Sequence, residues 1–382
     1  MMSTLSVRRA VITAAVATGV LGAAGCASVT PGSIAAAHVH YIPADNPNFK
    51  INKSRLLHPK KKYFGISLAG VPQSVTSPID TIKNEVGKRP NLDMYYMDWG
   101  TAAHAEAGVP NFDPGAAENA CAAGMLPMLT WESWDTTDTN ATQGVAYTQQ
   151  AFSMNRIIDG DFDAYIKKTA QAIASIGCPL ALRFDQEPNG YWYPWGVTNP
   201  TEKPLSDSIK QKAALYVRMW RHVHQIFTAA HATNVLWVWS PNIQSANGAK
   251  LVTFKQLYPG PSWVDWVGID GYYNTPQRTF STLFGSTIQQ LIPVAPHKPW
   301  MLAETGVGSS SRKPWQIKNL LDSIAKAKRF NGLVYFEQHK STDRSFWPFN
   351  DPAHPNSLPA FKKGIDQKVY ASGKPGDAWY LK

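Results

Sequence analysis

The chain has 382 residues, of which 44% are hydrophobic, and a formal net charge of +10. This length fits one large α/β domain or two ordinary domains, and the apolar fraction supports a sizeable core. The only dense basic run is Lys60-Lys61-Lys62, which is typical of a short solvated segment rather than of a nucleic-acid-binding surface. We therefore expect no nucleic-acid partner.

The beginning of the chain has the pattern of a bacterial export signal. Arg8 and Arg9 precede an apolar run over 10–20, which is shorter than the ~20 residues that a membrane-spanning helix needs. Small residues before Cys26 form a sequence like a lipobox, in which the cysteine becomes the lipidated first residue of the mature protein. We expect a signal over 1–25 and an extracytoplasmic protein that contacts the membrane only through this lipid; simple secretion is the alternative.

Residues 26–55 show little periodicity and are typical of a flexible linker, whereas 56–382 alternate short apolar runs with segments of helical spacing. The helical spacing is clearest at 162–176, 211–229 and 317–327. Eight apolar runs predict strands at 63–70, 94–100, 125–134, 179–187, 235–242, 264–273, 300–306 and 332–337. Eight such units predict a single α/β domain, a (β/α)8 TIM barrel. The rival fold, a doubly wound open sheet, lacks its Gly-rich phosphate turn after the first strand.

Two cysteines precede predicted neighbouring strands. Cys121 and Cys178 could form a disulfide in an oxidising compartment, but two separate buried thiols fit the sequence equally well because spacing does not determine geometry. No cysteine pair has the spacing of a metal site, and His222 and His224 point to different sides of a predicted helix. We expect no metal and no other cofactor.

Polar residues gather where the predicted strands end, which is where TIM barrels carry their chemistry. Four of the eight glutamates lie there, namely Glu132, Glu187, Glu304 and Glu337. Glu187 is followed at once by the aromatic run 191–195. Carboxyl groups beside exposed rings are typical of glycosidic bond cleavage, because sugar faces stack on rings and a carboxyl group can transfer the proton. The spacing alone does not show which two glutamates form a pair.

Strand alternation predicts that Arg183, Asp185 and Glu187 share one face. A neighbouring Asp185 would raise the pKa of Glu187, and Arg183 would lower it. A purely structural alternative is a buried ion pair between Glu187 and Arg183.

The run Arg183-Phe184-x-x-Glu187-x-Asn189-Gly190-x-Trp192-Tyr193-Pro194-Trp195 resembles the acid/base signature of glycoside hydrolase family 26, the β-mannanase-like family of clan A. The similarity spans roughly 60 to 370 in consistent order, which is more specific than one motif. It includes the segments 158–165, 219–223, 234–242, 258–260, 264–272 and 298–306.

The resemblance implies a TIM barrel in which Glu187 on the fourth strand is the acid/base and Glu304 on the seventh is the nucleophile. Their carboxyl groups would lie about 5 to 5.5 Å apart, as in retaining enzymes. Tyr272 matches the tyrosine that hydrogen-bonds the nucleophile, and Trp192 matches the aromatic residue beside the acid/base. Mannan-cutting members usually carry histidine where this chain has Gln186, so the departure bears on mannan as the substrate more than on hydrolysis.

The sequence thus predicts a monomeric, retaining hydrolase of a β-linked polysaccharide, most like an endo-β-1,4-mannanase. Mixed-linkage β-glucan, β-1,3-xylan and an envelope exopolysaccharide are alternative substrates. A catalytically silent glycan-binding lipoprotein is the alternative from another class. The expected substrate contacts are Trp99, Trp131, Trp134, Arg183, Gln186, Trp192, Trp239, Asn242 and Tyr272.

Overall fold

The computed structural model describes residues 51–69, 76–138, 149–199, 203–244, 251–338 and 347–377. All of them belong to one compact unit, His38–Lys382. The predicted signal, Cys26 and most of the predicted linker lie outside the described residues. The short helix α1 (Lys53–Leu57) starts within the last residues of the range predicted as linker.

Eight parallel strands close into a barrel, because each strand pairs with the next and β8 pairs with β1. The predicted (β/α)8 barrel is therefore confirmed, and each predicted strand overlaps one observed strand. The strands are β1 (Tyr63–Ser67), β2 (Leu92–Asp98), β3 (Leu126–Glu132), β4 (Leu180–Phe184), β5 (Val235–Trp239), β6 (Trp266–Tyr273), β7 (Trp300–Val307) and β8 (Phe330–Phe336).

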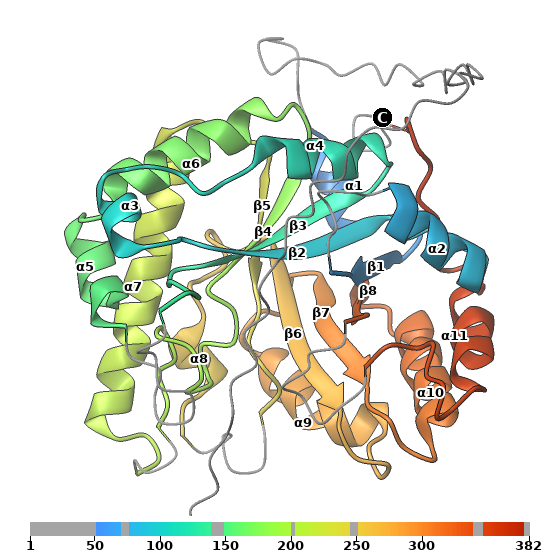
Figure 1. Cartoon of the computed structure of the whole chain (residues 1–382). Helices are drawn as coiled ribbons and strands as arrows, with labels where there is room; N and C mark the ends of the chain where they lie inside the picture. Colours follow the sequence, from blue (N-terminus) through green and yellow to red (C-terminus); the bar gives the residue numbers. More distant parts are fainter. Residues whose placement is uncertain are drawn as a thin grey trace, which may run out of the picture. The chain divides into compact units, whose positions relative to one another are not determined.

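Helices cover the outside of the barrel, with α5, α6 and α7 on one side and α2, α10 and α11 on the other (Figure 1). The longest, α7, begins where the Ser206 side chain accepts a hydrogen bond from the Ile209 backbone, and it buries apolar residues at helical spacing. The described helices are α2 (Thr76–Val86), α3 (Ala102–Glu106), α4 (Pro114–Ala122), η1 (Gln150–Phe152), α5 (Met154–Asp159), α6 (Asp163–Ser175), α7 (Asp207–Ala229), α8 (Phe254–Leu257), α9 (Phe280–Leu291), α10 (Lys313–Lys326) and α11 (Ser357–Ile365).

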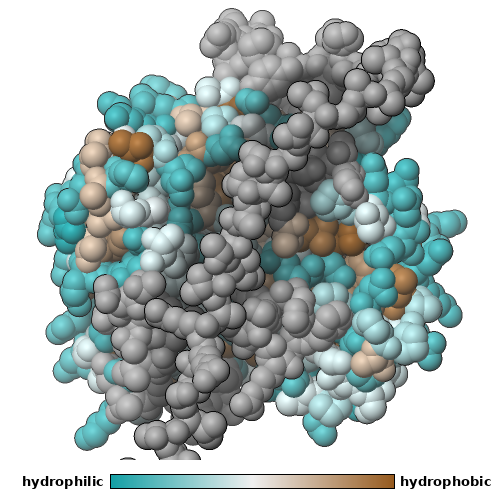
Figure 2. Space-filling view, viewed as in Figure 1, coloured by the Kyte–Doolittle hydropathy of each residue, from teal (hydrophilic) through white to brown (hydrophobic). Residues whose placement is uncertain are grey.

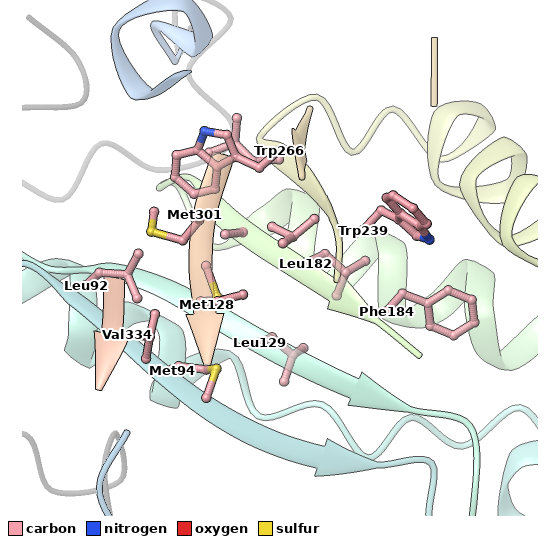
Figure 3. Close-up of a cluster of buried hydrophobic side chains, with 14 of the residues drawn as sticks. Leu92, Met94, Met128, Leu129, Leu182, Phe184, Trp239, Trp266, Met301 and Val334 are labelled. Atoms are coloured by element: carbon pink, nitrogen blue, oxygen red, sulfur yellow. The ribbon is translucent and has the colours of Figure 1, made fainter. Parts of the chain in front are cut away.

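The strands are buried on both faces, because side chains fill the barrel on one side and helices cover the other. This explains why they appear in the sequence as continuous apolar runs rather than as alternating ones. Figure 3 shows part of the core, where Met94, Met128, Leu182 and Met301 come from four different strands. In Figure 2, hydrophilic residues cover most of the visible described surface, and hydrophobic ones occur in small separate groups. Within the described ranges, no helix has the length and hydropathy to cross a bilayer.

A disulfide joins the two segments that lead into the neighbouring strands β3 and β4. Cys121 near the end of α4 is bonded to Cys178, two residues before β4 begins, with their Cα atoms 6.5 Å apart. The sequence left open whether these cysteines form a disulfide or remain two separate thiols, and in the structure they form the disulfide. Closing a loop of 57 residues stabilises the folded state by about 4 kcal/mol in the chain-entropy model.

Candidate active site

The backbone after β4 determines where Glu187 lies. Asp185 and Glu187 have φ angles of 43° and 55°, in the left-handed region that few non-glycine residues adopt. These angles end the strand alternation, so the prediction that Arg183, Asp185 and Glu187 share a face is wrong. The Asp185 carboxylate instead accepts hydrogen bonds from the Ser133 backbone N–H at 2.9 Å and the Ser133 hydroxyl at 2.7 Å.

Glu187 is held by two neutral donors. Trp192 Nε1 donates to Glu187 Oε2 at 2.6 Å, and Asn242 Nδ2 donates to Oε1 at 2.7 Å. Burial raises the pKa of Glu187 to about 8; the negative charges of Asp270 and Glu304 add to this, while Arg183 opposes it. Glu187 is therefore largely protonated at neutral pH. The aspartate that raises its pKa is Asp270 rather than the predicted Asp185.

Glu304, within β7, has a different set of partners. Tyr96 donates its hydroxyl to Glu304 Oε2 at 2.6 Å, and Tyr272 donates its hydroxyl to Oε1. Arg183 Nη2 lies 2.9 Å from the same Oε2. Two hydroxyl donors and one guanidinium all stabilise a carboxylate, so this environment favours the ionised form of Glu304.

Arg183 links β6 and β7, the strands that carry Asp270 and Glu304. Its fully buried guanidinium pairs with the carboxylates of Asp270 and Glu304 and donates to Thr130 Oγ1 at 3.0 Å. Asp270 also accepts a hydrogen bond from the Ser240 hydroxyl at 2.8 Å. The ion pairs of Arg183 are thus with these two residues, whereas the sequence alternative placed one with Glu187.

Gln186 faces a third carboxyl group. Its Nε2 donates to Glu132 Oε1 at 2.6 Å, and Trp134 Nε1 donates to the other oxygen at 3.2 Å. Burial raises the pKa of Glu132 to about 7, and both hydrogen bonds oppose the rise. Gln186 is only 1% exposed, and its Oε1 has no hydrogen-bond partner among the described residues. Gln186 and Glu132 lie beside the group of carboxyl side chains formed by Glu187, Asp270 and Glu304, because the charges of Arg183 and Glu304 act on Glu132.

Three tryptophans predicted to contact substrate are core residues instead. Trp99, Trp131 and Trp239 are 0% exposed. The rings of Trp99 and Trp131 pack 5.0 Å apart, and Trp239 packs against Tyr258. The physical reason is strand alternation: Trp131 lies between residues that face into the barrel, so its own side chain faces the helices. Trp192 differs, with 38% of its surface exposed beside Glu187.

Two aromatic residues near Glu304 were missed in the sequence. Tyr96 is on β2, where alternation from Met94 would have placed it inside the barrel. Trp347 packs against Tyr272, with the ring centroids 4.4 Å apart. No strand or motif precedes Trp347 closely enough in the sequence to indicate this position.

Glu337, the fourth strand-end glutamate, has a structural environment. Both of its carboxylate oxygens accept a hydrogen bond from the Phe349 backbone N–H, at 3.1 and 2.9 Å. Its side chain therefore holds the backbone at Phe349 close to the end of β8. No group of three or more His, Cys, Asp or Glu side chains within the described ranges could hold a metal ion.

The protein is thus a (β/α)8 barrel that carries two interacting carboxyl groups, Glu187 just after β4 and Glu304 within β7. A family model described as glycosyl hydrolase family 26 matches residues 80–296. This match covers more than half of the chain. The chain therefore belongs to glycosyl hydrolase family 26.

Curated relatives match parts of the chain. Endoglucanase H of Acetivibrio thermocellus is 28% identical over 251 residues, which cover 63% of this chain and 24% of that protein. A mannan endo-1,4-beta-mannosidase of Bacillus subtilis is 28% identical over 149 residues, which cover 38% of this chain and 36% of that protein. The matches thus cover about a quarter to a third of the length of these relatives.

Solved structures resemble the fold along most of the chain. The GH26 beta-mannanase of Bacteroides ovatus superimposes with a TM-score of 0.61 at 20% identity, covering 86% of this chain and 94% of that one. GH26C from Muricauda sp. MAR_2010_75 gives a TM-score of 0.62 at 16% identity, covering 86% and 91%. At such identities the likeness concerns the fold alone.

Proposed function

We propose that this protein is a retaining glycoside hydrolase that cuts within a β-linked polysaccharide. The observation that carries the proposal is the contrast between its two carboxyl groups. Glu187 is buried, bound by neutral donors and has a pKa of about 8, whereas Glu304 contacts a guanidinium and two phenols. One carboxyl group suited to donate a proton and one kept as an anion are what glycosidic bond cleavage requires.

The roles follow from these environments. Glu187 gives its proton to the glycosidic oxygen while the Glu304 carboxylate attacks the anomeric carbon, so the bond to the leaving sugar breaks as a glycosyl ester forms. Glu187, now ionised, then takes a proton from water, whose oxygen attacks the same carbon and releases Glu304. Tyr272 and Tyr96 hold the attacking carboxylate in position, and Trp192 offers a ring face to the sugar beside Glu187.

The leading substrate class is β-1,4-mannan or glucomannan. Two Bacillus subtilis relatives carry the name mannan endo-1,4-beta-mannosidase, and one of them is 30% identical over 116 residues. The name endoglucanase H of another relative keeps β-glucan as the second choice. This chain departs from the family pattern at Gln186, which donates a hydrogen bond to Glu132. Because an amide cannot take up a proton as histidine can, this position would change which substrate is preferred.

The test is release of reducing sugar from mannan, glucomannan, mixed-linkage glucan and β-1,3-xylan. Glu187→Ala and Glu304→Ala should each lower turnover by several orders of magnitude, while the surface variant Glu106→Gln should keep it. Proton NMR of the first product should show the β-anomer of the substrate retained. Inversion of configuration would contradict the mechanism. Binding of an oligosaccharide without turnover by the wild type would instead favour the glycan-binding role.

We also propose that the protein is exported and anchored through lipid on Cys26. The proposal rests on the sequence pattern before this cysteine, which lies outside the described residues. Metabolic labelling with a fatty acid analogue should mark the wild type and leave Cys26→Ala unlabelled. Label that persists in Cys26→Ala would contradict the anchor.

A further inference from the structure

A pocket lies at the end of the barrel where the strands begin, opposite to the end that carries Glu187 and Glu304. Its lining includes Tyr63, the first residue of β1, and Asn91, which directly precedes β2. Its volume is about 260 Å3, just below the range of pockets that enclose drug-sized ligands, so it suits a small group. None of the roles proposed above uses this pocket.

Most charged side chains around this pocket are cationic. Among the described lining residues, Asp377 is the single acidic one. The cationic residues are Arg55 from α1, Lys60 and Lys61 from the segment before β1, and Lys374 near the end of the described chain. The three lysines are exposed and form no ion pair with any described residue. Because like charges gathered around one cavity repel each other, the pocket favours an anion.

The basic run of the sequence is divided between a structural role and the pocket. Lys62 Nζ donates to the carbonyl oxygens of Ala327 at 2.8 Å and Phe330 at 2.5 Å, so it contacts the beginning of β8. Lys60 and Lys61 instead line the pocket. Two of the three lysines expected to be simply solvated therefore lie at a concave site.

Asn91 supplies a neutral donor to the pocket. Its side chain is 7% exposed, and its Oδ1 accepts a hydrogen bond from the Phe64 backbone N–H at 2.8 Å. Because a backbone N–H requires an acceptor, this contact assigns the amide oxygen to Phe64 and leaves the amide nitrogen for the pocket. The Asn91 Nδ2 group has no hydrogen-bond partner among the described residues. A nearly buried donor of this kind needs a partner in the pocket.

Backbone hydrogen bonds fix the wall that carries Lys374. The Gly373 N–H donates to the Arg89 carbonyl oxygen at 3.0 Å, and the Gly376 N–H donates to the Ala122 carbonyl oxygen at 3.0 Å. Lys374 lies between these two contacts, so its backbone is held in place before any ligand binds. A preformed wall lowers the entropy that binding costs.

We propose that this pocket binds a phosphate group, carried either by a phospholipid headgroup or by a small phosphate ester. The acceptor oxygens and negative charge of a phosphate match one guanidinium, three ammonium groups and one amide donor. The predicted linker 26–55 leads directly to Arg55, so in a protein anchored through Cys26 this end of the barrel would meet the membrane first. The pocket lies apart from Glu187 and Glu304, so the inference does not depend on the proposed hydrolase activity.

The test uses the full chain with Cys26→Ala, which removes the proposed lipid, and two probes. One probe is a vesicle of phosphatidylglycerol and phosphatidylcholine in equal parts, compared by sedimentation with a vesicle of phosphatidylcholine alone. The other is glycerol 3-phosphate, titrated by calorimetry. The pocket variant adds Lys60→Gln/Lys61→Gln/Lys374→Gln. All three side chains are exposed, so the fold should persist, and the melting temperature checks this.

The matched control adds Lys167→Gln/Lys168→Gln/Lys255→Gln, which removes the same charge from exposed lysines on α6 and α8. At low ionic strength, the pocket variant should bind the phosphatidylglycerol vesicles about a hundredfold more weakly, because it lacks three cationic contacts to an anionic surface. Its affinity for glycerol 3-phosphate should fall about tenfold. The control should change either affinity little.

Binding of glycerol 3-phosphate that only the pocket variant weakens supports a site for small phosphate esters. Binding confined to phosphatidylglycerol vesicles, and weakened only by the pocket variant, supports the headgroup as the source. Equal weakening in the pocket variant and the control would overturn the inference, because overall charge would explain it. Absence of binding to both probes would overturn it as well. Neither readout requires turnover, so a failure of the proposed function is seen separately in the release of reducing sugar.

Discussion

The hydrogen bond from Trp192 to Glu187 should control the pH range of activity. Trp192→Phe keeps an aromatic face beside Glu187 but removes the indole N–H that donates to Glu187 Oε2 at 2.6 Å. This donor stabilises the ionised form and lowers the pKa of Glu187 against the larger effect of burial. Its loss should therefore raise the pKa above the wild-type value of about 8.

The size of the shift follows from the strength of the lost bond. A hydrogen bond to a charged group contributes about 1.5 to 3 kcal/mol, and 1.36 kcal/mol corresponds to one pKa unit. Trp192 is 38% exposed, so water replaces part of the lost interaction, and Asn242 still donates to the other oxygen. We expect a rise of about one unit.

The assay is the pH dependence of kcat/KM, whose basic limb reports the acid of the free enzyme. The proposed acid, Glu187, must be protonated to act, so activity should fall as the pH rises through the pKa of Glu187. The basic limb should move from about pH 8 in the wild type to about pH 9 in Trp192→Phe. Trp315→Phe, at an exposed tryptophan on α10, controls for the substitution itself. A basic limb that stays in place or moves to lower pH would refute the reasoning.

Two further predictions concern stability. Asp93 is fully buried, its oxygens have no hydrogen-bond partner among the described residues, and burial raises its pKa to about 8. Because this pKa is above the value in the unfolded chain, the free energy of unfolding should fall by on the order of 4 kcal/mol as the pH rises from 5 to 8. Urea unfolding of Asp93→Asn should not show this fall. The same pH dependence in the variant as in the wild type would contradict the prediction. Lys313→Met should cost about 3 to 5 kcal/mol because it leaves the Asp351 carboxylate buried without the ammonium 3.1 Å away. The double variant Lys313→Met/Asp351→Leu should recover most of the loss in the same assay, and no recovery would argue against a charge effect.

The barrel was predictable because both faces of its strands are buried. Each strand therefore appears as an apolar run, and the helices between them keep a helical period. The positions where the apolar runs stop also indicated the carboxyl ends of the strands. Since the carboxyl ends of parallel strands meet at one end of a barrel, Glu187 and Glu304 could be assigned to the same end. The order of strands required no long-range information, since each parallel strand pairs with its neighbour in the chain.

It was harder to predict whether a side chain near the end of a strand faces into the barrel or toward the helices. Trp131 and Trp239 follow the alternation outward into the helix layer, whereas the same rule fails after Phe184 because Asp185 and Glu187 adopt positive φ. A positive φ at a non-glycine residue leaves no mark in the sequence. Strand alternation predicts that Tyr96 faces into the barrel. However, its neighbours include several polar and aromatic residues, and no motif distinguishes it from them.

The proposed division of roles between the two carboxyl groups depends on where the buried guanidinium of Arg183 lies. Arg183 contacts Glu304 and Asp270, and two phenols complete the environment of Glu304, so these contacts favour its charged form. The same anions lie near Glu187, which has only neutral donors, and they disfavour a further negative charge there. The charge held on Glu304 therefore helps to keep the proton on Glu187. In the proposed mechanism, ester formation would neutralise Glu304, which would lower the pKa of Glu187 and suit it to act as a base in the second step.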